Sequence, residues 1–87
     1  MLKIIYTITH YKNVLTSQLY HDLLKYYKGR DASVEADFDA STITIEVRDP
    51  ELAAADLKNI KSCYGLASRL ISGFVKTKVF IDDKEVV

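Results

Sequence analysis

The chain has 87 residues, of which 48% are hydrophobic and 28% charged, so its composition excludes a disordered chain and allows one small domain. Twelve basic and twelve acidic side chains give a net charge of zero, so no overall field attracts nucleic acid or anionic lipid. The single cysteine, Cys63, excludes an intramolecular disulfide and a zinc site built from several thiolates.

The first predicted element is a strand at residues 2–9, because β-branched and aromatic side chains alternate along it. A helix is predicted at residues 14–29, with Asn13 as its N-cap and Gly29 after its last turn. The predicted inner face of the strand holds Leu2, Ile4, Tyr6 and Ile8, and the outer face holds Lys3, Ile5, Thr7 and Thr9. The apolar stripe of the helix holds Leu15, Leu19, Leu23 and Tyr26 with Tyr20, Leu24 and Tyr27 beside them.

Two strictly alternating segments, residues 33–39 and 42–48, predict an antiparallel hairpin joined at Ala40 and Ser41. Its inner face is expected to hold Val34, Ala36, Phe38, Ile43, Ile45 and Val47. Its outer face holds the carboxylates Glu35, Asp37, Asp39 and Glu46. Such a face could bind a cation, but it is more typical of a solvated face that discourages aggregation.

A second helix is expected to begin at Asp49 and Pro50 and to run to about Phe74, since Asp is a good N-cap and Pro suits the first helical position. Its core side would hold Ala53, Leu57, Ile60, Cys63, Tyr64, Ala67, Leu70, Ile71 and Phe74. Residues 75–82 predict a short last strand followed by a turn, although residues 77–87 could instead form a tail. The sequence therefore predicts a single α+β domain over residues 1–87, in the order β-α-β-β-α(-β), with two helices on one face of a small, mainly antiparallel sheet, as in the split-βαβ ferredoxin-like plan.

No residue pattern predicts catalysis, a metal site or a cofactor. His10 and His21 have no His or Cys at metal-ligand spacing, and Cys63 falls on the core side of the second helix, where a thiol is inert. No pair of groups stands where a nucleophile and its base would. We therefore expect a protein that is not an enzyme.

The outer side of the second helix is the candidate interface, because small residues there alternate with cations. Glycine inside a helix costs about 1 kcal/mol relative to alanine, so Gly65 suggests that another backbone approaches closely. The candidate partner-contact residues are Lys61, Ser62, Gly65, Leu66, Ser68 and Arg69. The same residues would also suit an ordinary solvated face, or direct contact with RNA phosphates.

Three stretches resemble the small dimerisation subunit of the KEOPS complex, the Pcc or CTAG-like family. They are QLYHDLL at residues 18–24, STITIEVRDPELAAADLK at residues 41–58, and the Ser62, Cys63, Tyr64 run. The resemblance implies a noncatalytic scaffold that forms a homodimer, or a heterodimer with a paralogue. It also implies docking of the catalytic subunit that makes threonylcarbamoyladenosine in tRNA, with indirect or weak tRNA contact.

Two other readings stay open: a small ferredoxin-like regulatory or ligand-binding dimeric domain, and a small RNA-binding domain. No stretch approaches the roughly 20 apolar residues of a membrane span, and the N-terminus lacks the features of a signal peptide. We therefore expect a cytoplasmic protein without a membrane partner.

Overall fold

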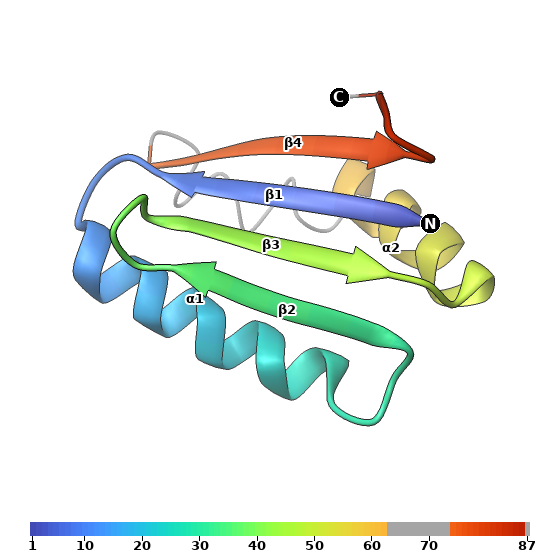
Figure 1. Ribbon diagram of the computed structural model, residues 1–87, viewed down its shortest axis with the longest axis horizontal. Coiled ribbons are helices and arrows are strands. Elements are labelled where there is room, and N and C mark those ends of the chain that lie inside the picture. The colour runs from blue at the N-terminus through green and yellow to red at the C-terminus, as the bar shows by residue number, and fades with distance from the viewer. Residues whose placement is uncertain (63–73, 87) are drawn as a thin grey trace.

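The computed structural model describes residues 1–62 and 74–86, with the side chains of residues 59–62 left out. The described part is an α+β fold of two helices and an antiparallel open sheet of five strands (Figure 1). The elements are β1 (Leu2–Ile8), α1 (Lys12–Tyr27), β2 (Ala32–Asp37), β3 (Thr42–Val47), α2 (Pro50–Ser62), β4 (Val75–Ile81) and β5 (Lys84–Glu85). The predicted fold class and the predicted last strand are thus confirmed, and β5 is an addition.

The sheet has the strand order β2-β3-β1-β4-β5, and every neighbouring pair is antiparallel. The first strand of the chain is therefore central, between β3 and β4. Leu2 faces Val47 on one side and Ile81 on the other. Up to β4, the element order is that of the split-βαβ plan.

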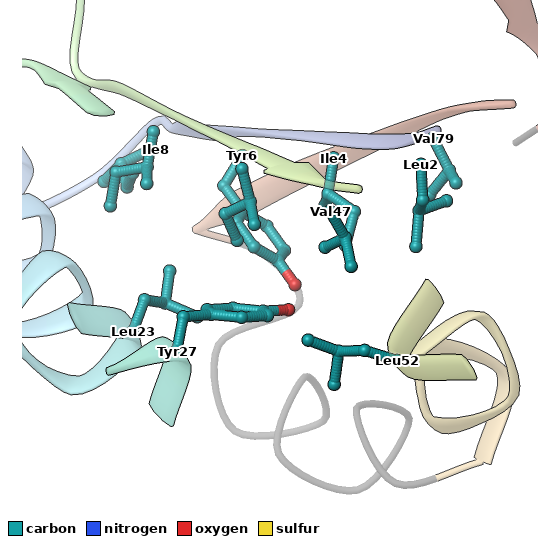
Figure 2. Packing of buried hydrophobic residues seen from close by; sticks show 11 residues of the cluster. Leu2, Ile4, Tyr6, Ile8, Leu23, Tyr27, Val47, Leu52 and Val79 are labelled. Atoms are coloured by element: carbon teal, nitrogen blue, oxygen red, sulfur yellow. The ribbon is translucent and has the colours of Figure 1, made fainter. Parts of the chain in front are cut away.

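The core lies between one face of the sheet and the two helices, which both cover that face (Figure 1). Ile43, Ile45 and Val47 are fully buried, as the alternation of the hairpin predicts. In Figure 2, Leu23 and Tyr27 of α1 and Leu52 of α2 point toward the side chains of the sheet. The buried cluster comprises Leu2, Ile4, Tyr6, Ile8, Leu23, Tyr27, Ile43, Ile45, Val47, Leu52 and Val79.

Helix α1 begins earlier and buries a narrower stripe than its sequence predicts. It begins at Lys12 after Tyr11, whose left-handed backbone (φ 51°, ψ 43°) turns the chain, so the prediction of Asn13 as N-cap is wrong. Leu23 and Tyr27 face the sheet, and Leu24 and Tyr26 beside them are exposed. The prediction that Leu24 and Tyr26 belong to the packing stripe is therefore also wrong.

Helix α2 begins as predicted, because the backbone N–H of Glu51 donates to Asp49 Oδ1 at 3.0 Å and Pro50 is the first helical residue. The predicted core residues Ala53 and Leu57 are half-buried and pack against the core, as predicted. Leu52 and Asp56 are more deeply buried than these two, so the buried side also includes residues that the prediction left out. Phe74 lies in the turn before β4, which makes the predicted end of the helix wrong at that residue. The rest of the predicted core side, from residue 60 to 71, lies outside the described side chains.

The turns are set by residues with positive φ. Gly29 follows α1 with φ 76°, as predicted. Asp82 and Asp83 both have positive φ and form the two-residue turn between β4 and β5, which is the geometry that matches the twist of a hairpin. The β2–β3 turn starts at Phe38, whose side chain is 50% exposed, so its predicted inward position is wrong.

Candidate interaction surface

The interface that the sequence predicts lies almost entirely outside the described part of the chain. Lys61 and Ser62 are in the last turn of α2, where only the backbone is described. Gly65, Leu66, Ser68 and Arg69 lie outside the described residues. Contact through this side of the second helix therefore stays a prediction.

The face of the sheet opposite the helices, which we call the open face, is covered by no described helix (Figure 1). Strand register aligns its side chains in three rows that run from β2 across β3 and β1 to β4. The rows are Ser33–Glu46–Lys3–Phe80, Glu35–Thr44–Ile5–Lys78 and Asp37–Thr42–Thr7–Lys76.

Charge and polarity are ordered along these rows. The outer strand β2 contributes exposed carboxylates, and β4 contributes the exposed ammonium groups of Lys76 and Lys78. Between them, Ile5 and three threonines form a half-buried centre without charge. In two of the three rows the open face thus changes from acidic on β2 to basic on β4. In the row that begins at Ser33, the charged residues Glu46 and Lys3 lie on the two middle strands, and Phe80 is paired with Glu85 of β5.

The predicted carboxylate cluster is not gathered into one site. Asp39 lies in the β2–β3 turn, and Asp37 Oδ1 accepts from the backbone N–H groups of Asp39 and Ala40 at 3.0 and 3.1 Å. Through these hydrogen bonds, the Asp37 side chain stabilises the β2–β3 turn. Within the described residues, no group of three His, Cys, Asp or Glu side chains could hold a metal ion.

A second surface, which we call the Phe38 patch, consists of Tyr20, Leu24 and Phe38. The rings of Tyr20 and Phe38 meet edge to face with centroids 6.0 Å apart. Leu24 is one turn further along α1 than Tyr20 and is 40% exposed. Helix periodicity placed Tyr20 on the packing stripe, and this is confirmed, because Tyr20 is half-buried and packs against the core. It placed Leu24 there wrongly, and alternation placed Phe38 inward, so this patch was missed.

Between the two helices, the buried carboxylate of Asp56 accepts hydrogen bonds from two tyrosine hydroxyls. Asp56 is 4% exposed, and Tyr27 Oη donates to its Oδ2 at 2.6 Å while Tyr26 Oη donates to its Oδ1 at 3.1 Å. The hydroxyls of Tyr6 and Tyr27 point toward one another (Figure 2). Sequence reasoning missed Asp56; the available signal was its spacing of one helical turn from Leu52, which places both on the buried side of α2. These hydrogen bonds connect α1 to α2.

Both histidines have local partners. His10 Nδ1 lies 3.0 Å from Thr9 Oγ1, and its ring packs on Phe74 with centroids 5.1 Å apart. His21 Nδ1 donates to the backbone carbonyl of Ser17 at 2.7 Å, one turn earlier in α1. These contacts explain the positions of both histidine side chains without assigning either one a catalytic role.

Each described helix borders an open hollow of about 190 Å³. One has an almost wholly apolar lining that includes Leu2, Leu57 and Ile81, and the other lies beside α1 between Leu15 and Val75. Neither matches the usual ligand pocket of at least about 300 Å³ with convergent polar groups. The ligand-binding reading thus gains no specific support from them.

No protein-family model, curated protein or solved structure matches the chain. Within residues 1–62 and 74–86, neither helix has the length and apolar character needed to cross a membrane. The geometry and the residues themselves are therefore the basis for a functional proposal.

Proposed function

We propose that the protein is a noncatalytic scaffold subunit that docks another protein chain through its helical layer. The observation that carries this proposal is the Phe38 patch, where the half-buried ring of Tyr20 meets the exposed ring of Phe38 and the exposed Leu24 follows one helical turn after Tyr20. Single exposed apolar residues are ordinary, but aromatic groups that cluster are typical of the centres of protein interfaces.

The finer proposal is that this scaffold docks the catalytic subunit of a complex that makes threonylcarbamoyladenosine in tRNA. It is supported by the sequence resemblance to the KEOPS small subunit, whose helices meet the catalytic subunit. The Phe38 patch includes Tyr20 and Leu24 of the QLYHDLL segment, one of the stretches that carry that resemblance. The candidate residues of the second helix, Lys61 to Arg69, would extend the same docking role.

Substitution of Leu24 tests the proposal. Leu24→Asp places a charge in the Phe38 patch, and because the side chain is already exposed the fold should persist. We expect capture of the partner by the tagged protein from its native lysate to fall at least about tenfold, as for a central interface residue. Mass spectrometry with a parallel RNA readout measures this.

Gln18→Asp is the matched control, because it introduces the same charge at an exposed position on another side of α1. Its capture should equal that of the unmodified protein. A sugar-kinase-like ATPase, a small kinase and tRNA among the Leu24-dependent proteins would support the finer proposal. Equal capture by both variants would contradict docking through the Phe38 patch.

RNA recovered without any protein would instead favour the small RNA-binding domain. Its affinity should then fall steeply with salt, because each phosphate contact releases counterions. The basic groups available for this on the described strands are few: Lys3 on β1, Lys76 and Lys78 on β4, and Lys84 on β5. That distribution favours the protein-docking role.

A further inference from the structure

We propose that the outer edge of β2 binds an extended segment of the partner protein as a further strand of the sheet, and that this segment alternates basic with apolar side chains. The inference rests on the proposed docking function, because the Phe38 patch borders the same edge. It deepens that function by naming the chemical pattern of the segment that docks.

The outer edge of β2 is a strand edge that can accept a further strand. β2 is the first strand in the order β2-β3-β1-β4-β5, and within the described part of the chain it pairs with β3 alone. Alternate residues of Ala32–Asp37 therefore direct their backbone N–H and C=O groups away from the sheet. An added strand would satisfy these groups, which is how extended peptides bind at sheet edges.

The Phe38 patch lies beside this edge, on the helical side of the sheet. Helix α1 contacts β2 and runs along it in the opposite direction (Figure 1). Phe38 directly follows β2, its ring meets that of Tyr20, and Leu24 continues the apolar surface along α1. A strand added at β2 would place every second side chain on this side, where apolar groups would cover Phe38 and Leu24.

The remaining side chains of the added strand would lie on the open face, beside carboxylates. Glu35 and Asp37 are exposed on that face of β2. They are two residues apart, so their spacing matches that of alternate residues in a neighbouring strand. Lysine or arginine at two such positions would each lie next to an opposite charge, which stabilises cross-strand pairs. Asp37 keeps its negative charge while Oδ1 accepts the two hydrogen bonds of the turn.

The same carboxylates disfavour other strands at this edge. Two copies of the chain joined through β2 would bring Glu35 and Asp37 of one copy beside the same residues of the other. Like charges on neighbouring strands are destabilising, and an acidic segment of another protein would meet the same repulsion. The charge of the edge therefore favours a basic segment from a different chain.

A synthetic peptide tests the proposal, with its binding to the full chain measured by fluorescence anisotropy. The probe is a short peptide that alternates lysine with isoleucine and phenylalanine. It should bind at least about tenfold more tightly than the same peptide with glutamate in place of lysine, because of the carboxylates on β2. Binding should also slow the hydrogen exchange of backbone amides within residues 32–37, since those that point outward gain a partner.

Methylation of the peptide backbone separates strand pairing from contact between side chains alone. An extended strand directs the N–H groups of alternate residues toward opposite edges. Two probes are therefore made, each N-methylated on one of the two alternate sets. The probe with methyl groups toward β2 should bind at least about tenfold more weakly, because several hydrogen bonds are lost, and the other should stay within about threefold.

Glu35→Lys should weaken binding of the lysine peptide at least about tenfold and strengthen binding of the glutamate peptide. Asp22→Lys is the matched control, because it makes the same change of charge at an exposed position of α1 beside Val75, away from β2. Its affinity for the lysine peptide should equal that of the unmodified chain. Normal binding by the Glu35→Lys chain, equal binding of the two methylated probes, or unchanged exchange in β2 would each overturn the proposal.

The outcomes separate this inference from the proposed function. If Leu24-dependent capture from the lysate persists while neither Glu35→Lys nor methylation changes peptide binding, strand addition is wrong and the scaffold function stands. If peptide binding depends on Glu35 and on methylation while no captured protein depends on Leu24, the strand site stands and the docking function is wrong. Where both stand, Glu35→Lys should lower the capture of the same proteins as Leu24→Asp, because one segment contacts both positions.

Discussion

The Asp56 carboxylate is removed from water and held by two hydroxyl donors on α1. Hydrogen bonds to a charged acceptor are stronger than neutral ones, and loss of a donor leaves a buried charge less well compensated. The bond from Tyr27 is the shorter, at 2.6 Å, and Tyr27 is itself buried. The stability of the contact between the two helices should therefore depend on this hydroxyl.

Tyr27→Phe keeps the ring in the core and removes only the hydroxyl. We expect the free energy of unfolding to fall by about 1.5–3 kcal/mol, the usual worth of a hydrogen bond to a charged group. Urea denaturation measures the change. Tyr11→Phe, at a position that is 72% exposed, should change stability by less than about 0.5 kcal/mol. Equal stability of the two variants would show that the buried bond contributes nothing.

A second charged contact joins the first residue of the chain to the β4–β5 turn. The amino group of Met1 donates to Asp82 Oδ1 at 2.8 Å. This bond and the positive charge of the amino group lower the pKa of Asp82 below its usual value, against a smaller opposing effect of desolvation. Since the folded-state pKa is the lower one, the associated stabilisation is present above the unfolded-state pKa and is lost as pH falls through the folded-state pKa.

The pKa of Asp82 can be followed directly by NMR titration of its side-chain carboxyl carbon. We expect a midpoint below that of an unfolded chain. Acetylation of the Met1 amino group removes both the charge and the bond, so it should raise the midpoint. A midpoint that acetylation does not move would contradict the role given to Met1.

At the scale of elements, α1 ends at Tyr27 and is followed by a type II turn. In this turn Lys28 has φ −58° and ψ 126°, Gly29 has φ 76°, and the backbone N–H of Arg30 donates to the carbonyl of Tyr27 at 3.1 Å. Residues with a Cβ rarely adopt this left-handed backbone conformation, because the strain costs roughly 1–2 kcal/mol. A Cβ built on Gly29 meets no atom within 4 Å, so the cost of substitution should come from the backbone alone.

Gly29→Ala should accordingly lower the midpoint of thermal unfolding, with a loss of about 1 kcal/mol. Gly29→Asn should lose less, because asparagine tolerates the left-handed region better than alanine does. If alanine proved as stable as glycine, the turn would have to relax away from positive φ.

Local patterns in the sequence predicted most of these elements. The alternation in the hairpin named Ile43, Ile45 and Val47 as core, and the Asp49, Pro50 pair gave the start of α2, because both signals depend on neighbours in the chain. Periodicity was less informative in α1. Leu24 and Tyr26 fit an apolar stripe, but only packing against a particular sheet decides that Leu23 and Tyr27 point inward.

At the scale of the whole molecule, the candidate surfaces were harder to predict than the fold. The acidic to basic order of the open face depends on which strands are neighbours and in what register. Glu35 and Lys78 belong to the same row only because β1 and β3 stand between them. No pattern along residues 33–39 or 75–82 shows which strands are neighbours. The sequence therefore predicted the carboxylates of the outer face but not that Lys76 and Lys78 lie in the same rows.

The central place of β1 has a consequence for biosynthesis. A ribosome releases β1 first, yet its two neighbours in the sheet, β3 and β4, follow much later in the chain. Until Val75–Ile81 has left the exit tunnel, one edge of β1 has no strand to pair with, and an unpaired edge is a template for aggregation. We therefore expect chaperones to bind the nascent chain until Val75–Ile81 has emerged.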